Sequence, residues 1–390
     1  MRTGAALELR IGSTISSESG GSIRPQGPPQ ERTLEAARSW LRERLERRAH
    51  PLDQVDPTAA RATIEALDGI DPESWAAAWG ATAERFAATA EQAGRAEERR
   101  VAYEQAYAFS FLGRYPVPNH PAKERQYERA RAFFLEAARL EDPPVERVVV
   151  QLDGADLPFY VTRPSGVERP PVVIVWGGID TWKEEMHFRL GAAFRAAGCA
   201  VLLVDIPGVG ESPIPASRDA ERQWTPIFDW LAARQDLDGA RCAAVGASFG
   251  GYWAQKLAYT HRDRLRCCVN WGGGVHITFT REWQERSRDA PSYLMDLMVA
   301  RARIFGGETF EEYVERCAEL SLLEQGLLEQ PSAELLLVNG RDDRQNAIDD
   351  LYLSLDYGDP KAARVFDGGH MGEGPVVPTI VAWVRSRLER

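Results

Sequence analysis

The stretch VGASFGG, residues 245–251, decides the fold of this chain. It contains Gly-x-Ser-x-Gly, follows the apolar run RCAAVG and opens a helical segment near 249–260, so it predicts a tight turn between a strand and a helix. A serine on such a turn takes a strained backbone conformation that needs small neighbours, and Gly246 and Gly250 meet that need. We therefore predict a nucleophile at Ser248, at a helix N-terminus that stabilises an oxyanion. The alternative is a chance match to a common motif in a loop.

Apolar runs alternate with helical segments on both sides of this turn. PVVIVW and CAVLLVD precede it, whereas LRCCVNW, AELLLVNG and ARVFD follow it, with helices expected near 183–197, 217–233 and 374–388. Continuous apolar strands separated by helices indicate a parallel sheet covered on both faces. Before them, VERVVVQL and LPFYVTRP alternate with period two around a Gly-Ala-Asp turn, which predicts a β-hairpin. The sequence therefore predicts an α/β fold.

The regions outside this pattern predict the domain organisation. Residues 1–31 are rich in Gly, Ser and Pro and have no period, which indicates a disordered tail. Residues 32–143 show helical spacing in four or five segments, which indicates a helical N-terminal domain. The remaining chain, 144–390, forms the α/β domain. Its segment of about 275–332 is amphipathic and too long for a plain connection, so we expect a helical cap over the sheet.

The composition excludes several classes of protein. The chain has 390 residues with a formal charge of −11, which is unlike a protein that binds nucleic acid or an anionic membrane. The sequence has no run of 18 apolar residues that would cross a membrane, and its start lacks the apolar stretch of a secretory signal. Its five cysteines are an odd number with no CxxC pair or His/Cys cluster, so we expect buried free thiols in the cytoplasm and no metal site.

A serine nucleophile needs a base and an orienting acid, which should follow it in the order Asp, then His, each after a late strand. Asp343 follows AELLLVNG and His370 follows ARVFD. Asp342 is the alternative acid, and we favour Asp343 because it stands three residues after the glycine that ends the strand. Most other histidines precede the turn or fall at a helix end. His276 begins the cap and comes within reach of the site, but it stands too early in the chain to be the base.

The loop GGIDTWKEE, residues 177–185, follows the third strand and is expected to complete the oxyanion hole. We predict one backbone N–H donor from Gly178 or Ile179 and the other from Phe249. Asp180 is unusual there, because a bare carboxylate opposes a developing negative charge. It either points to solvent, caps the helix that begins near Lys183, or assists the chemistry when it is protonated or paired.

Together, the serine turn, GGIDTWKEE, the late Asp and His and the N-terminal helices resemble the FrsA-like α/β-hydrolases. Among them, the layout is similar to 2,6-dihydroxypseudooxynicotine hydrolase and to fungal polyketide-shortening hydrolases over roughly residues 100–390. The resemblance implies an α/β-hydrolase fold, a serine triad without a cofactor, a homodimer and hydrolysis of a carbon–carbon bond beside a ketone. It also implies that the acidic residue after Gly-Gly, here Asp180, assists cleavage.

These observations lead to a serine hydrolase acting on a medium-sized, partly aromatic ketone such as a β-diketone, a hydroxyaryl ketone or a polyketide-like molecule. An esterase or thioesterase of secondary metabolism is the first alternative, and a regulatory binding protein of the same family is the second. Trp182 and His276 are candidate substrate contacts, as are the cap aromatics Phe279, Trp283 and Tyr293, although core packing explains each equally well. For Asp180 to donate a proton, the cap would have to exclude water and raise its pKa.

Overall fold

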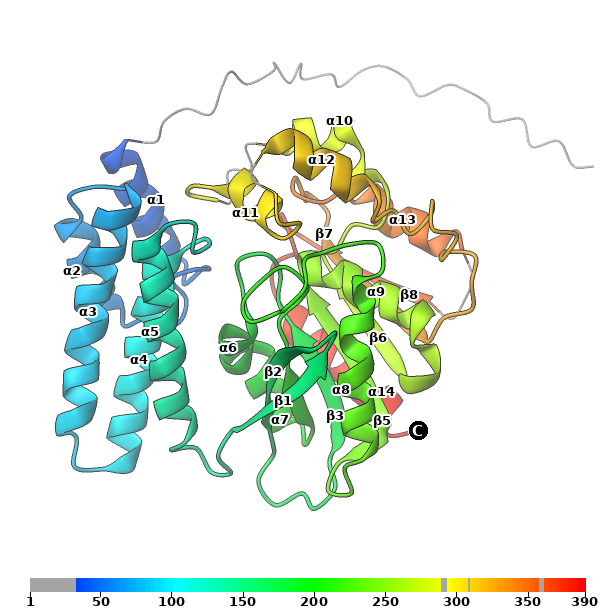
Figure 1. Cartoon of the computed structure of the whole chain (residues 1–390), viewed down its shortest axis with the longest axis horizontal. Coiled ribbons are helices and arrows are strands. Elements are labelled where there is room, and N and C mark those ends of the chain that lie inside the picture. The colour runs from blue at the N-terminus through cyan, green and yellow to red at the C-terminus, as the bar shows by residue number, and fades with distance from the viewer. Residues whose placement is uncertain (1–32, 289–292, 308, 358–360) are drawn as a thin grey trace, which may run out of the picture. The chain divides into compact units, whose positions relative to one another are not determined.

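The computed structural model describes residues 33–288, 293–307, 309–357 and 361–390. The tail predicted for residues 1–31 lies outside them. A sheet of eight strands in the order β1-β2-β4-β3-β5-β6-β7-β8 forms the centre of the described chain (Figure 1). The six strands from β3 to β8 are parallel, and β1 and β2 form the predicted antiparallel hairpin. The strands are β1 Glu146–Leu152, β2 Ala155–Thr162, β3 Pro171–Trp176, β4 Ala200–Leu203, β5 Asp238–Ala247, β6 Cys267–Trp271, β7 Glu334–Gly340 and β8 Lys361–Phe366.

Helices cover both faces of the sheet, as the continuous apolar strands predict. Along β3, Ile174 and Trp176 pack into the core beneath α8 and α9, whereas Val173 and Val175 pack into the core beneath α7 and α14. All five cysteines are buried free thiols, which confirms the prediction from their spacing. The covering helices are α6 Lys183–Met186, α7 Ala192–Ala196, α8 Thr225–Ala232, α9 Phe249–Thr260, α13 Asp349–Leu355 and α14 Val376–Leu388.

In the described part of the chain, five helices precede the sheet, and we call them the helical region. Four of them begin at favourable caps: the side chains of Thr33, Asp56, Asp71 and His120 each accept a backbone N–H in the first turn of a helix. Helices α3, α4 and α5 lie side by side (Figure 1). The aromatic ring of Phe134 on α5 lies 4.9 Å from that of Tyr160 on β2, so the helical region packs directly on the sheet domain. The helices are α1 Leu34–Glu46, α2 Pro57–Ala66, α3 Pro72–Gln92, α4 Ala96–Arg114 and α5 Pro121–Ala138.

The segment between β6 and β7 carries three helices, α10 Arg281–Arg286, α11 Leu297–Arg303 and α12 Phe310–Ala318, which we call the cap. Its start is anchored by the buried carboxylate of Asp350 on α13, which accepts the four consecutive backbone N–H groups of residues 275–278 at 2.7–3.1 Å. The cap also binds the helical region. Lys123 Nζ and Asn119 Nδ2 each donate to Asp296 Oδ2 at 3.1 Å, and Lys123 is fully buried.

The structure differs from the sequence prediction at several helices. The expected helix near 183–197 is divided into α6 and α7 by a π-helical turn, His187–Gly191. In the cap, α11 begins only at Leu297, because Asp296 takes a left-handed conformation with φ 55°. Helix α13 was not predicted at all. Within the described ranges, no helix has both the length and the apolar character that crossing a membrane requires.

Candidate active site

Ser248 stands on the tight turn between β5 and α9. Its backbone takes φ 56° and ψ −129°, a conformation that residues other than glycine rarely adopt. Its N–H donates to the Trp271 carbonyl at 2.7 Å. The neighbouring glycines leave no room for a side chain: a Cβ on Gly246 would lie 2.0 Å from the Gly250 carbonyl oxygen, and one on Gly250 would lie 2.1 Å from that of Gly177. The turn therefore has the strained geometry that the motif predicts.

The structure brings Ser248, His370 and Asp343 into one chain of hydrogen bonds. Ser248 Oγ lies 2.7 Å from His370 Nε2, and His370 Nδ1 lies 2.8 Å from Asp343 Oδ2. The side chain of His370 is 12% exposed and that of Asp343 is fully buried. Asp342, the alternative acid, is exposed, and its backbone N–H pairs with Gly368. The residue next to the histidine is therefore Asp343.

The Asp343 carboxylate is held mainly by backbone groups of its own loop. Oδ1 accepts the N–H groups of Gln345 and Asn346 at 2.8 and 3.1 Å, and Oδ2 accepts Asn339 Nδ2 at 2.9 Å. Burial acts to raise the pKa of Asp343, but His370, Asn339 and the Gln345 N–H outweigh it and lower that pKa below its usual range. The acid is therefore ionised and fixed on the imidazole.

Asn339, at the end of β7, is a residue that sequence reasoning missed. Its Oδ1 accepts the N–H groups of Gly340 and Met371, at 2.8 and 3.0 Å, while its Nδ2 donates to Asp343. Met371 follows His370 and takes a left-handed conformation with φ 72°. One buried amide thus fixes both the acid and the loop that carries the histidine.

The predicted oxyanion-hole residues lie against Ser248. A Cβ added to Gly178 would lie 2.8 Å from Ser248 Cβ and 3.3 Å from the backbone nitrogen of Phe249, so the loop after β3 runs directly beside the turn. The next residue, Ile179, is buried, and its carbonyl accepts Trp182 Nε1 at 3.2 Å. Phe249 is the first residue of α9, where backbone N–H groups lack intrahelical partners. Gly178 and the first residue of α9, Phe249, thus lie beside Ser248.

Asp180 is buried and paired. Its Oδ2 lies 3.2 Å from His50 Nε2, it shares a hydrogen bond with Tyr293 of the cap, and its carbonyl accepts Arg114 Nη2 at 2.5 Å. Burial alone would raise the pKa of Asp180, but the charge and hydrogen bond of His50, the Tyr293 hydrogen bond and the charge of Arg114 lower it to about 2.

These contacts bear on the alternatives that the sequence leaves open for Asp180. Its carboxylate is ionised, not protonated, because its charged partners outweigh the effect of water exclusion. It is also not the cap of α6: the Lys183 N–H donates instead to Asp205 Oδ1 at 3.0 Å. Of the readings open from sequence, the paired carboxylate is the one that the geometry matches.

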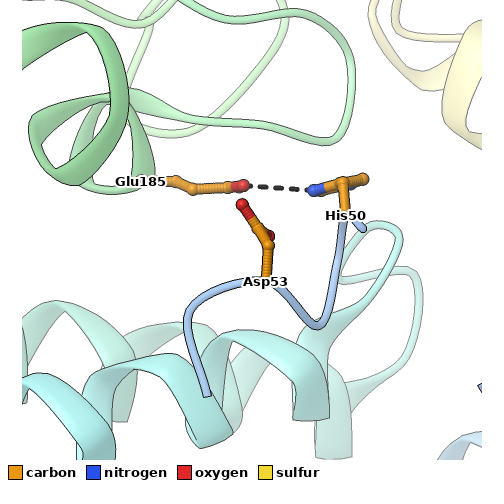
Figure 2. A group of neighbouring side chains, drawn as sticks. All are labelled: His50, Asp53 and Glu185. Carbon is orange, nitrogen blue, oxygen red and sulfur yellow. Dashed lines mark hydrogen bonds and ion pairs between the residues drawn. The ribbon is translucent and has the colours of Figure 1, made fainter. Parts of the chain in front are cut away.

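His50 belongs to a group of charged side chains drawn in Figure 2. Its Nδ1 lies 3.1 Å from Glu185 Oε1, and both residues lie near Asp53 (Figure 2). The ligand atoms of these three residues fall within 4.8 Å of one another, close enough to hold a metal ion. However, Arg189 Nη2 lies 2.7 Å from Asp53 Oδ1, 2.9 Å from Glu185 Oε1 and 3.1 Å from His50 Nδ1. The guanidinium thus takes the position that a metal ion would need.

Trp182 and His276, the candidate substrate contacts, lie in different surroundings. The Trp182 ring packs between Arg114, 3.9 Å away, and Tyr127, 4.5 Å away, and it lines a cavity of about 260 Å³. The walls of this cavity come from the loop after β3, the helical region, the loop at 208–215 and the cap. His276 does not line it; its Nδ1 lies 2.7 Å from Ser321 Oγ within the cap.

The other cap aromatics also have distinct positions. Phe279 packs edge-on against Phe249 at 6.3 Å, beside the serine turn. Trp283 donates from Nε1 to the Gln345 carbonyl at 3.0 Å, next to the loop of the triad acid. Tyr293 reaches Asp180. A larger cavity of about 610 Å³ lies among Arg262, Arg264 and Arg266 and contains none of the predicted site residues.

The fold and this site define an α/β-hydrolase with a serine at its nucleophile turn. The family model described as "Esterase FrsA-like" matches residues 64–344, and the chain belongs to that family. The crystal structure of 2,6-dihydroxy-pseudo-oxynicotine hydrolase superposes with a TM-score of 0.74 at 22% identity, covering 86% of this chain and 94% of that one. At that identity the likeness shows the fold.

Curated relatives cover parts of the chain. The α/β hydrolase xenA of Xenoacremonium sinensis is 31% identical over 54% of this chain and 53% of its own length. A 2,6-dihydropseudooxynicotine hydrolase of Paenarthrobacter nicotinovorans is 33% identical over 39% and 42%, and esterase FrsA of Photobacterium profundum is 24% identical over 85% and 81%. The chain thus spans about half the length of several curated relatives that it matches.

Proposed function

We propose that this protein is a serine hydrolase that cleaves a carbon–carbon bond next to a ketone. The hydrogen-bonded chain Ser248–His370–Asp343 carries this proposal, since it places a nucleophile, a base and an ionised acid at the distances that acyl transfer needs. The relative named as a pseudooxynicotine hydrolase supports a ketone substrate. The substrate class is a β-diketone, a hydroxyaryl ketone or a similar polyketide-like small molecule.

The proposed mechanism has two stages. Ser248 Oγ bonds to the ketone carbon while His370 Nε2 takes its proton, and the backbone N–H groups of Gly178 or Ile179 and Phe249 stabilise the oxyanion. The carbon–carbon bond then breaks, and its electron pair goes to the leaving carbon, where it is delocalised as an enolate. The leaving carbon then takes the proton from His370. Water, deprotonated by His370, attacks the acyl-enzyme and releases a carboxylic acid and free Ser248. No cofactor takes part in these steps.

In this mechanism Asp180 acts as an ionised acceptor. A carboxylate cannot donate a proton to the leaving carbon, but it accepts a hydrogen bond from an enol or phenol hydroxyl of the substrate. That hydrogen bond orients the substrate. It also increases the electron density on the leaving carbon, which makes protonation of that carbon easier. The proposal therefore favours ketones with a hydroxyl group near the bond that breaks.

An esterase or thioesterase is the second candidate, supported by the FrsA-like family description and by the esterase among the relatives. A regulatory binding protein is the third and would leave the triad idle. We also propose a homodimer in the cytoplasm; the free thiols are consistent with a reducing compartment, and light scattering of the purified chain tests the dimer.

Two measurements on the full chain test the function. A fluorophosphonate probe should label Ser248, and hydrolysis of benzoylacetone and of hydroxyaryl ketones should release the carboxylic acid and the shorter ketone or arene expected from cleavage. Labelling with ester hydrolysis but without ketone cleavage would favour the esterase. The absence of labelling would reject both enzymatic candidates.

A further inference from the structure

His50 lies in the loop between α1 and α2, in the helical region and before the segment that the family model matches. Its ring bridges two carboxylates of the sheet domain: Nε2 lies 3.2 Å from Asp180 Oδ2, and Nδ1 lies 3.1 Å from Glu185 Oε1. Figure 2 shows the contact with Glu185. The ring also packs edge-on against Phe111 and Tyr115, with ring centres 6.4 and 6.0 Å apart. Nδ1 also lies 3.1 Å from Arg189 Nη2, and both groups face Glu185 Oε1, so a protonated ring and the guanidinium share this carboxylate.

We propose that His50 is a positioning residue for the hydrolytic reaction, and that its imidazolium keeps the Asp180 carboxylate ionised and fixed beside the oxyanion loop. The proposal rests on the function proposed above. It means that the helical region, which supplies none of the triad, contributes a charged side chain that acts on Asp180.

The balance of charge around His50 supports a protonated ring. The carboxylates facing this region are those of Asp180, Glu185 and Asp53, and the guanidiniums are those of Arg189 and Arg114, with Tyr115 and Tyr293 as neutral phenols. Protonated His50 makes three positive charges against three negative ones. A neutral ring would leave an excess negative charge in a largely buried cluster, which is costly.

The titration behaviour points the same way. Burial alone would lower the pKa of His50, but the charges and hydrogen bonds of Glu185 and Asp180 raise it to about 9, so the ring is charged at neutral pH. Without this charge, the effect of burial on Asp180 is less opposed, and the pKa of that carboxyl rises from its low value. Removing His50 should therefore make Asp180 take up a proton at a higher pH than in the native protein.

Full-length variants test this coupling. His50→Ala, His50→Gln, Asp180→Asn and the double variant H50A/D180N are compared on the ketone that the native protein cleaves fastest and on p-nitrophenyl acetate, across the pH range in which each stays folded. His120→Gln is the matched control, because it removes the other imidazole of the helical region, which only caps α5. Thermal unfolding of each variant reports any loss of stability separately.

We expect His50→Ala to lower kcat for the ketone about 10- to 100-fold, the equivalent of one charge-assisted hydrogen bond, with a smaller effect on the ester. The acid limb of its ketone profile should move to higher pH, which a purely structural role would not cause. His50→Gln should recover part of the loss, because its amide can donate to Asp180. The double variant should be no slower than Asp180→Asn, since His50 acts through Asp180.

Three results would overturn the inference alone: additive losses in the double variant, an unchanged pH profile in His50→Ala, or the same loss in His120→Gln. If His50→Ala does not fold, the 15N spectrum of the histidine-labelled native chain decides, with His50→Gln used for assignment. His50 should be protonated at neutral pH, and a neutral ring would contradict the proposal. A chain without Ser248-dependent turnover would instead refute the proposed function, and this inference with it.

Discussion

Two clusters lie on either side of the loop 177–180, and they are built in different ways. The Ser248 cluster takes each residue from a loop that follows a strand of the sheet, and backbone groups hold its acid in place. The Asp180 cluster takes His50 and Arg114 from the helical region and Tyr293 from the cap, and charged side chains hold it together. The first cluster is therefore a property of the sheet domain, whereas the second exists only when three regions meet.

This difference separates two tasks. In the proposed mechanism, Ser248 and His370 provide a nucleophile and a base that any acyl transfer can use. The Asp180 cluster holds a carboxylate whose ionisation depends on partners from outside the sheet, and we propose that it distinguishes a ketone from an ester. Substitutions in the two clusters should therefore affect different substrates, and the predictions below follow from that division.

The largest effect is expected at Ser248. Ser248→Ala removes the nucleophile with little change in volume and should lower turnover of both ketone and ester by about 10⁴- to 10⁶-fold. Thermal unfolding and circular dichroism should show an intact fold, and fluorophosphonate labelling should disappear. Near-normal turnover of either substrate in this variant would refute the proposed mechanism.

The next effect is expected at Asp180, and it is selective. Asp180→Asn keeps the size of the side chain but removes the charge that orients the substrate hydroxyl, so ketone cleavage should fall by about 10²- to 10³-fold, the scale of one lost transition-state electrostatic contact. Hydrolysis of p-nitrophenyl acetate should fall much less, because the p-nitrophenolate leaving group departs without help from Asp180. Equal losses on both substrates, or none on either, would show that Asp180 has no special role.

The smallest effect is expected at Asn339. Asn339→Ala leaves the N–H groups of Gly340 and Met371 without their acceptor and loosens Asp343, so turnover of both substrates should fall by about 10- to 100-fold. Asn270→Ala is the matched control: this amide is equally buried at the end of the neighbouring strand β6 and binds Gly273 and Gln255 instead. Similar kinetic losses in both variants would mean that Asn339 acts only through stability.

Most of the fold could be predicted from the sequence because its signals are local. The Gly-x-Ser-x-Gly turn, the apolar strands and the period of two in the hairpin are each read from a few neighbouring residues. The π-helical turn at His187–Gly191 and the short helix α13 were missed, because neither has a local signature: α13 is seven residues long, and Asp350 is fixed by contacts with the cap.

The candidate site can be divided in the same way, into residues with a local signal in the sequence and residues without one. The order of serine, aspartate and histidine after successive strands predicts the residues that the structure brings together at 2.7 and 2.8 Å. The partners of Asp180 could not be predicted, because His50 stands 130 positions away in the sequence and no local pattern links the two residues. The charge state of Asp180 depends on those partners, so the sequence alone leaves its protonated and paired readings open.

The contact at Asp296 has a mechanical consequence. Lys123 and Asn119 of the helical region both hold this cap residue, and the ammonium group of Lys123 has no exposure to water. Lifting the cap by itself would strip a buried cation of its carboxylate, which is strongly unfavourable. The cap and the helical region are therefore coupled at this point, and a displacement of the cap that keeps Lys123 paired must carry helix α5 with it.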